Sequence, residues 1–187
     1  NPNYKAKNPF PHQSEAFEIL SKSFAFPIDK YAGGLLVLPT GGGKTFTAVN
    51  WISRNVLSRK IKVLWLAQSS YLLNQAFGSF CDNSLEILNR DAINIRVVSS
   101  SSEHSKASTI SQTDDVLIIT TQTAISNFNT EARDINGNIL ETEFKKFIKS
   151  SAGSGIFVVL DEAHHAPAYG FRSLWKGMSD LISGFYI

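Results

Sequence analysis

Pro39-Thr40-Gly41-Gly42-Gly43-Lys44-Thr45 is the stretch that decides the fold of this 187-residue chain. It follows the apolar residues 35–38, which the sequence predicts to be a buried strand, and precedes residues 46–52, which it predicts to be helical. A strand, a glycine-rich turn and a helix in this order form a phosphate cradle, because backbone N–H groups and the positive end of the helix dipole converge there. The sequence therefore predicts a nucleoside-triphosphate site.

Within this stretch, the phosphate-binding residues are expected to be Thr40, Gly41, Gly42, Gly43, Lys44 and Thr45. Lys44 would reach the β- and γ-phosphates, and the Thr45 hydroxyl would hold Mg²⁺. The alternative is a glycine-rich connection with no chemical role. The Lys-Thr pair and the flanking strand and helix favour the phosphate site. Leu38 stands six positions before Lys44, where the general form of the motif has glycine. The strict motif is therefore not met at its first position, which reduces the number of P-loop classes that fit.

A second segment supports this prediction. The apolar residues 156–160 end in Asp161-Glu162-Ala163-His164-His165. Open α/β sheets bind ligands at the carboxyl ends of their strands. Asp161 is expected to hold Mg²⁺, and Glu162 to orient or deprotonate an attacking water. The alternative is an acidic N-cap of the next helix.

Together these two segments resemble the helicase superfamily 2 ATPases, and more narrowly the branch with a DEAH-type box that includes type III restriction-enzyme-like and DNA-repair-like helicases. Residues 39–45 match motif I of that group, the Walker A element, and residues 161–165 match its motif II, with a doubled histidine. Weaker matches follow in the right order. Residues 11–13 resemble the upstream glutamine element, residues 65–75 motif Ia and residues 118–124 motif Ib.

The resemblance implies ATP and Mg²⁺ as cofactors and gives roles to further residues. Gln13 would read the adenine edge, since its amide donates and accepts at once; the alternative is a solvated side chain. Phe10 stands where many relatives carry arginine. His164 and His165 resemble coupling residues that sense the phosphate site and pass its state to a partner domain. Adjacent histidines lack the usual spacing of zinc ligands.

The resemblance also places nucleic-acid contacts in the loops after the motif Ia and Ib strands. Hydroxyl and amide groups there suit phosphate oxygens. The residues concerned are Gln68, Ser69, Ser70, Thr121, Gln122 and Thr123. Ser and Thr are also ordinary N-caps, and that alternative stays open. Contacts of this kind read the backbone of a nucleic acid, which suits an enzyme that moves along a strand.

Composition sets limits on the partners. The formal net charge is only +2, so no strongly basic surface indicates nucleic acid. The single cysteine, Cys81, excludes an internal disulfide and suits a reducing compartment. No apolar stretch approaches the roughly 20 residues of a membrane span, and the first residues do not resemble a signal peptide. We expect a soluble, cytoplasmic protein without membrane contact.

The periodicity of apolar residues predicts the order of elements. Strands are expected at residues 62–67, 93–98, 116–120 and 156–160, and helices at 11–24, 71–80, 85–90 and 141–149. Asn136-Gly137 predicts a hairpin turn, and residues 99–113 an exposed, mobile connection. Strands separated by helices favour a mostly parallel sheet covered on both faces. We expect a three-layer α/β, RecA-like P-loop NTPase domain over residues 1–187.

The resemblance implies a nucleic-acid-dependent ATP hydrolase, a helicase or translocase. The doubled histidine favours DNA over RNA by resemblance alone, and an RNA helicase is the runner-up. A second RecA-like domain of a longer chain is the expected partner, with restriction or defence subunits as further candidates. Without that domain, we expect the chain to bind nucleotide and hydrolyse it slowly. The alternative function is a P-loop switch without motor activity; Glu162 beside Asp161 favours the motor.

Overall fold

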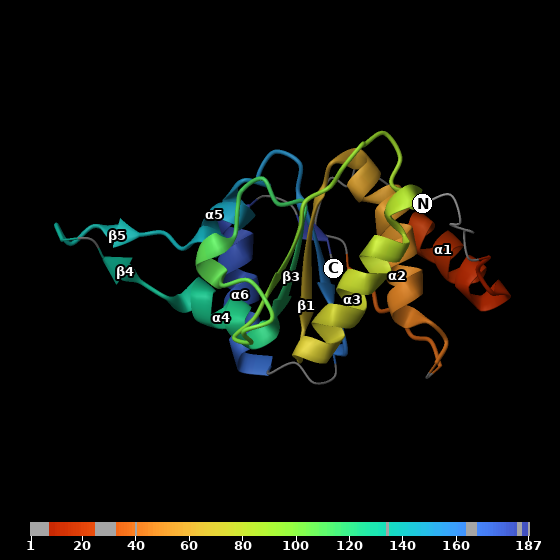
Figure 1. Ribbon diagram of the computed structural model, residues 1–187, viewed down its shortest axis with the longest axis horizontal. Coiled ribbons are helices and arrows are strands. Elements are labelled where there is room, and N and C mark those ends of the chain that lie inside the picture. Colours follow the sequence, from red (N-terminus) through yellow and green to blue (C-terminus); the bar gives the residue numbers. More distant parts are fainter. Residues whose placement is uncertain are drawn as a thin grey trace.

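Five parallel strands form the central sheet of the computed structural model, which describes residues 8–24, 33–39, 41–133, 135–163, 168–182 and 185–186 (Figure 1). The strand order is β2-β3-β1-β6-β7. The strands are β1 (Lys62–Ala67), β2 (Ile95–Val98), β3 (Val116–Thr120), β6 (Ile156–Leu160) and β7 (Phe185–Tyr186). Because neighbouring strands run parallel, the carboxyl ends of β1, β3 and β6 meet at one edge of the sheet.

Helices cover both faces of this sheet, as Figure 1 shows. On one side lie α1 (Pro11–Ser23), α2 (Lys44–Asn55) and α3 (Ser70–Asp82), and on the other α4 (Thr121–Asn129), α5 (Glu143–Lys149) and α6 (Ala168–Leu181). Side chains alternate along β1, so that Trp65 packs in the first core and Leu64 and Leu66 in the second. The predicted three-layer α/β architecture with a mostly parallel sheet is confirmed. No helix in the described part of the chain is long and apolar enough to cross a membrane.

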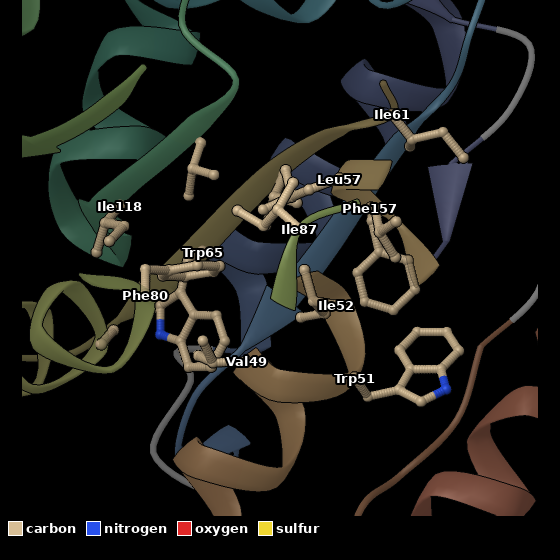
Figure 2. Packing of buried hydrophobic residues seen from close by; sticks show 14 of the residues in the cluster. Val49, Trp51, Ile52, Leu57, Ile61, Trp65, Phe80, Ile87, Ile118 and Phe157 are labelled. Atoms are coloured by element: carbon tan, nitrogen blue, oxygen red, sulfur yellow. The ribbon is translucent and has the colours of Figure 1, made fainter. Parts of the chain in front are cut away.

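Aromatic rings fix α2 and α3 against the sheet (Figure 2). Trp65 of β1 meets Phe80 of α3 edge-on, with ring centroids 5.8 Å apart. Trp51 of α2 and Phe157 of β6 are also 5.8 Å apart, and Phe24 packs against both. Tilted and edge-on pairs of this kind add to the stabilisation from burial. They hold α2 against β6 and α3 against β1.

Most predicted elements are present. The strands at residues 62–67, 116–120 and 156–160 have the predicted bounds, and β2 begins two residues later than predicted. Asn136-Gly137 does form the turn of a hairpin, between β4 (Ala132–Arg133) and β5 (Ile139–Leu140), which projects from the body between α4 and α5 (Figure 1). The connection at residues 99–113 is less exposed than predicted, since Ser99 and Ile110 are buried and η3 (Ala107–Thr109) forms within it.

The strand predicted at residues 35–38 is wrong. Residues 33–39 pair with no strand among the described residues, and Leu35 and Val37 are 79% and 75% exposed. Among the described residues, the side of β6 that faces away from β1 pairs only with β7, at Ile156 and Phe157. An apolar segment is stabilised by contact with other apolar groups, but a strand forms only where a neighbouring backbone offers hydrogen-bond partners. These residues instead line a cavity beside the carboxyl half of β6.

The helix predicted at residues 85–90 is also wrong. Helical hydrogen bonding there is confined to one short 3₁₀ turn, η2 (Ser84–Glu86). Asn89 has φ 62°, a left-handed conformation through which a right-handed helix does not continue. A second 3₁₀ turn, η1 (Leu57–Arg59), follows α2 and leads into β1.

Two helical glycines provide a test of the packing. A Cβ on Gly177 of α6 would lie 2.1 Å from the ring of Phe128 on α4, whereas a Cβ on Gly78 of α3 would meet nothing within 4 Å. Gly177→Ala should cost about 3 kcal/mol in overpacking against about 1 kcal/mol gained in helix propensity, and so lower the free energy of unfolding by about 2 kcal/mol. Gly78→Ala should raise it by up to about 1 kcal/mol. Urea denaturation measures both; shifts of the same sign would contradict this account of the α4–α6 contact.

Candidate nucleotide-binding site

The glycine-rich turn and the acidic pair meet at one cavity of about 840 Å³ at the carboxyl edge of the sheet. Lys44 and Thr45, the first residues of α2, line it together with Asp161 and Glu162, which follow β6. The N–H of Asp161 donates to the carbonyl of Leu66 over 2.8 Å, so Asp161 stands where the pairing of β1 with β6 ends. The fold thus brings together a cation, a hydroxyl and two carboxylates from distant parts of the sequence.

The turn before α2 depends on glycine. Gly43 is the N-cap of α2 and has φ 77°, which favours a residue without a side chain. A Cβ there would lie 2.5 Å from Nε2 of Gln13. Gly42 N donates to Pro39 O over 2.8 Å and closes the turn. The backbone therefore begins α2 at Lys44 with its first N–H groups facing out of the helix end.

Two side chains from α1 hold this turn. Nε2 of Gln13 and Nε2 of His12 both donate to the carbonyl oxygen of Gly42, each over 3.1 Å. The carbonyl of the Gln13 side chain accepts from the N–H of Phe10 over 3.0 Å. A glutamine amide has two N–H groups and two carbonyl lone pairs, so one of each stays available to a further partner. The structure thus places Gln13, buried, against the P-loop.

Electrostatics at the acidic pair favour a cation. Burial raises the pKa of Asp161, and the negative charge of Glu162 raises it further. The indole N–H of Trp65 and the charge of Lys44 lower the pKa of Asp161 in part. The Trp65 N–H is buried, close to this carboxylate but without the geometry of a closed hydrogen bond. Glu162 has φ 51°, a backbone conformation that a non-glycine residue adopts where function or packing requires it.

These residues fit Mg²⁺. Thr45 and Asp161 offer oxygen atoms, the ligand type that this ion takes, and the partly buried Asp161 carboxylate lies beside the like charge of Glu162. Within the described ranges, no cluster of three or more His, Cys, Asp or Glu side chains could hold a metal. Mg²⁺ in phosphoryl-transfer sites is bound by one or two protein oxygens together with phosphates and waters, so the small donor set agrees with it.

The predicted nucleic-acid residues differ in exposure. Ser69 and Gln122 are exposed, Gln68, Ser70 and Thr123 are half-buried, and Thr121 is 1% exposed. The Thr121 hydroxyl donates to the carbonyl of Ala67 over 3.3 Å and accepts from Gln68 over 3.4 Å. The burial of Thr121 argues against its predicted contact with a nucleic acid, because its hydroxyl joins the residues at the ends of β1 and β3 inside the protein.

The N-cap interpretation holds for part of these loops. The Ser69 hydroxyl accepts from Leu72 N and caps α3, and the hydroxyl of Thr120 accepts from Thr123 N and caps α4. Capping fixes the direction of each helix start at the carboxyl edge. Thr40, His164 and His165 lie outside the described residues.

Comparison with known proteins agrees with this geometry. A family model described as "Type III restriction enzyme, res subunit" matches residues 6–183. The chain belongs to this family. No curated protein matches it. Among solved structures it is similar to the UvsW helicase from bacteriophage T4, with a TM-score of 0.58 and 17% identity over 97% of this chain. The match covers 52% of that structure, so this chain spans about half its length. At this identity the likeness shows the fold alone.

Residues beyond the predicted ones also lie at the site of this res-subunit domain. The Gln75 side chain of α3 donates to the hydroxyl of Thr45 over 3.4 Å. His12 bonds the P-loop carbonyl of Gly42, and Trp65 approaches Asp161. None of these three contacts has a signal in the sequence, because each depends on tertiary packing.

Proposed function

We propose that this chain is the ATP-binding domain of a nucleic-acid-dependent motor, a helicase or translocase, with DNA as its favoured track. The observation that carries the proposal is the single cavity lined by Lys44 and Thr45 on one side and by Asp161 and Glu162 on the other. A phosphate-binding cation, a hydroxyl and two carboxylates are the groups that phosphoryl transfer requires. Membership of the restriction-enzyme res-subunit family supports the same assignment.

Each residue has a proposed role. Residues 40–45 hold the phosphates, with Lys44 on the β- and γ-oxygens, and Gln13 contacts the adenine through its remaining donor and acceptor. Thr45 and Asp161 hold Mg²⁺, which when bound neutralises charge that develops on the phosphates. Glu162 orients the attacking water and accepts its proton.

Two groups of residues extend this assignment. The surface formed by Gln68, Ser69, Ser70, Gln122 and Thr123 contacts the phosphates of the nucleic acid. His164 and His165 couple the phosphate site to a second RecA-like domain, which completes the catalytic cleft. Restriction or defence subunits are proposed as further partners. A chain without the second domain is expected to bind nucleotide and to hydrolyse it slowly.

Phosphate release by the full-length natural protein tests the proposal. It is measured without nucleic acid and with single-stranded DNA, duplex DNA and RNA, each for the wild type and for Lys44→Ala. We expect at least tenfold stimulation by DNA, with loss of the stimulated rate and of most ATP affinity in the variant, because Lys44 neutralises the β- and γ-phosphates. Lys60→Ala is a control at an exposed lysine beyond the end of α2. Slow turnover that no nucleic acid stimulates would instead support a nucleotide switch. Stimulation by RNA alone would identify RNA, and not DNA, as the nucleic acid on which the motor acts.

A further inference from the structure

α3 joins the P-loop to one of the loops proposed to contact nucleic acid. Its first turn is capped by Ser69, and six residues further on Gln75 donates from Nε2 to Oγ1 of Thr45 over 3.4 Å. Six residues of helix span about 9 Å along the axis. A single rigid element thus carries both the proposed phosphate contact and a bond to the proposed metal-binding hydroxyl.

The Gln75 side chain places one donor on the Thr45 hydroxyl. A threonine hydroxyl has one hydrogen and two lone pairs. The N–H of Gln75 occupies one lone pair, which leaves the other for a cation in the cavity that Thr45 shares with Asp161. Groups that bond to a metal ligand in this way typically change metal affinity by about 10–100-fold when they are removed.

The packing of α3 converts a change at Thr45 into a change at the helix start. Leu73, Ala76 and Phe80 are all fully buried against the sheet, so α3 moves as one rigid element and does not bend locally. Gln75 lies on the exposed side of the same helix. Close-packed helices respond to a contact at one point by small rigid shifts rather than by local bending. A shift of α3 reaches Ser69 and Ser70 directly.

We propose that Gln75 is a positioning residue that couples the metal-binding hydroxyl of the P-loop to the nucleic-acid loop at the start of α3. The inference rests on the proposed function and deepens it. By linkage, the coupling acts in both directions: Mg²⁺-nucleotide changes the affinity for nucleic acid by the same factor as nucleic acid changes the affinity for Mg²⁺-nucleotide.

The neighbouring residue provides a matched control. Asn74 is also an amide on α3, but its Oδ1 faces Nε2 of His104 over 2.9 Å, and Nδ1 of His104 lies 2.8 Å from the Ser99 hydroxyl. Asn74 therefore ties α3 to the loop after β2 and not to the P-loop. Asn74→Ala removes an amide from the same helix without affecting Thr45.

The experiment compares the full-length natural protein with its Gln75→Ala and Asn74→Ala variants. Binding of a fluorescent ATP analogue is titrated with Mg²⁺ and repeated in EDTA, and the affinity for single-stranded DNA is measured with and without the Mg²⁺-bound analogue. In Gln75→Ala we expect about a tenfold higher Mg²⁺ half-saturation, an unchanged nucleotide affinity in EDTA, and a smaller effect of nucleotide on DNA affinity. Asn74→Ala should match the wild type in all three.

The outcomes separate this inference from the proposed function. If the wild type shows Mg²⁺-dependent nucleotide binding coupled to DNA and Gln75→Ala does the same, the role of Gln75 is overturned and the proposed function stands. Equal losses in both variants would indicate a general loosening of α3 and would also overturn it. A wild type that binds nucleotide without any effect of Mg²⁺ or DNA would remove the proposed function itself.

Discussion

Replacing Glu162 with Gln is expected to slow DNA-stimulated phosphate release by about 10²–10⁴-fold while leaving ATP affinity nearly unchanged. Gln keeps the size and the hydrogen-bonding reach of Glu but cannot accept a proton at neutral pH. Glu162 lines the cavity beside Asp161, and its left-handed backbone is retained in the variant because the side-chain shape is the same. Single-turnover hydrolysis and equilibrium binding, measured on the same full-length protein, separate the two effects.

Glu103→Gln is the matched control for this experiment. Glu103 is exposed in the connection after β2 and lies outside the cavity, so its variant should hydrolyse ATP as the wild type does. A Glu162→Gln variant that loses ATP binding in parallel with hydrolysis would place Glu162 in phosphate binding or in folding. A variant with full activity would show that another group takes the proton.

The elements that position this site could be predicted because their signals are local. Residues 63–67, 116–119 and 156–160 are apolar runs of strand length, each followed directly by polar residues. In a parallel sheet these polar residues must meet at one edge, which assigns Asp161 to that edge. Lys44 could be assigned to the same site from the glycine-rich turn and the helix that follows it. The glycine-rich turn also has a local signal, since glycine permits the left-handed backbone that Gly43 adopts.

The predictions that failed concern features that depend on strand pairing or on the direction of a side chain. Residues 35–38 have a strand composition, but whether a strand forms depends on a partner backbone, and β7 pairs with β6 only at Ile156 and Phe157. Thr121 has a suitable hydroxyl, yet Thr120 caps α4 and Thr121, the first residue of this helix, is buried. The contact of Gln75 with Thr45 could not be predicted, because it joins residues of two separate helices.

Asp161→Asn is expected to stabilise the ligand-free protein at neutral pH while abolishing its stabilisation by Mg²⁺ and ATP. The pKa of Asp161 is raised above its ordinary value of 3.8 by burial and by the charge of Glu162. As the pH rises above the ordinary pKa of 3.8, Asp161 ionises first in the unfolded chain. The free energy of unfolding therefore falls until Asp161 has ionised in the folded protein as well. Above the pKa of the folded state the decrease is complete, and we expect all of it near pH 7. Asn carries no charge and avoids it.

Thermal unfolding at several pH values measures this effect. The melting temperature of Asp161→Asn should exceed that of the wild type at pH 7, and the difference should shrink as the pH falls toward the ordinary carboxyl range. Each 1 kcal/mol corresponds to about 2–4 °C for a domain of this size. Asp114→Asn is the control with the opposite sign, since Asp114 is buried and accepts two hydrogen bonds from Arg96 at 2.6 and 3.0 Å. Removing that charge leaves Arg96 without its partner and should lower stability.

Ligand reverses the order of the two proteins. At a Mg²⁺-ATP concentration 100 times its dissociation constant, binding adds about 2.7 kcal/mol to the stability of the wild type. Asp161→Asn loses the only described carboxylate that we assign to the metal and should gain little. We therefore expect the order of the two melting temperatures to reverse. Asp161→Asn should melt at the higher temperature without ligand, and the wild type should melt at the higher temperature with it. A variant that melts lower under both conditions would show that the Asp161 carboxylate stabilises the fold. That result would contradict its assignment as a metal ligand.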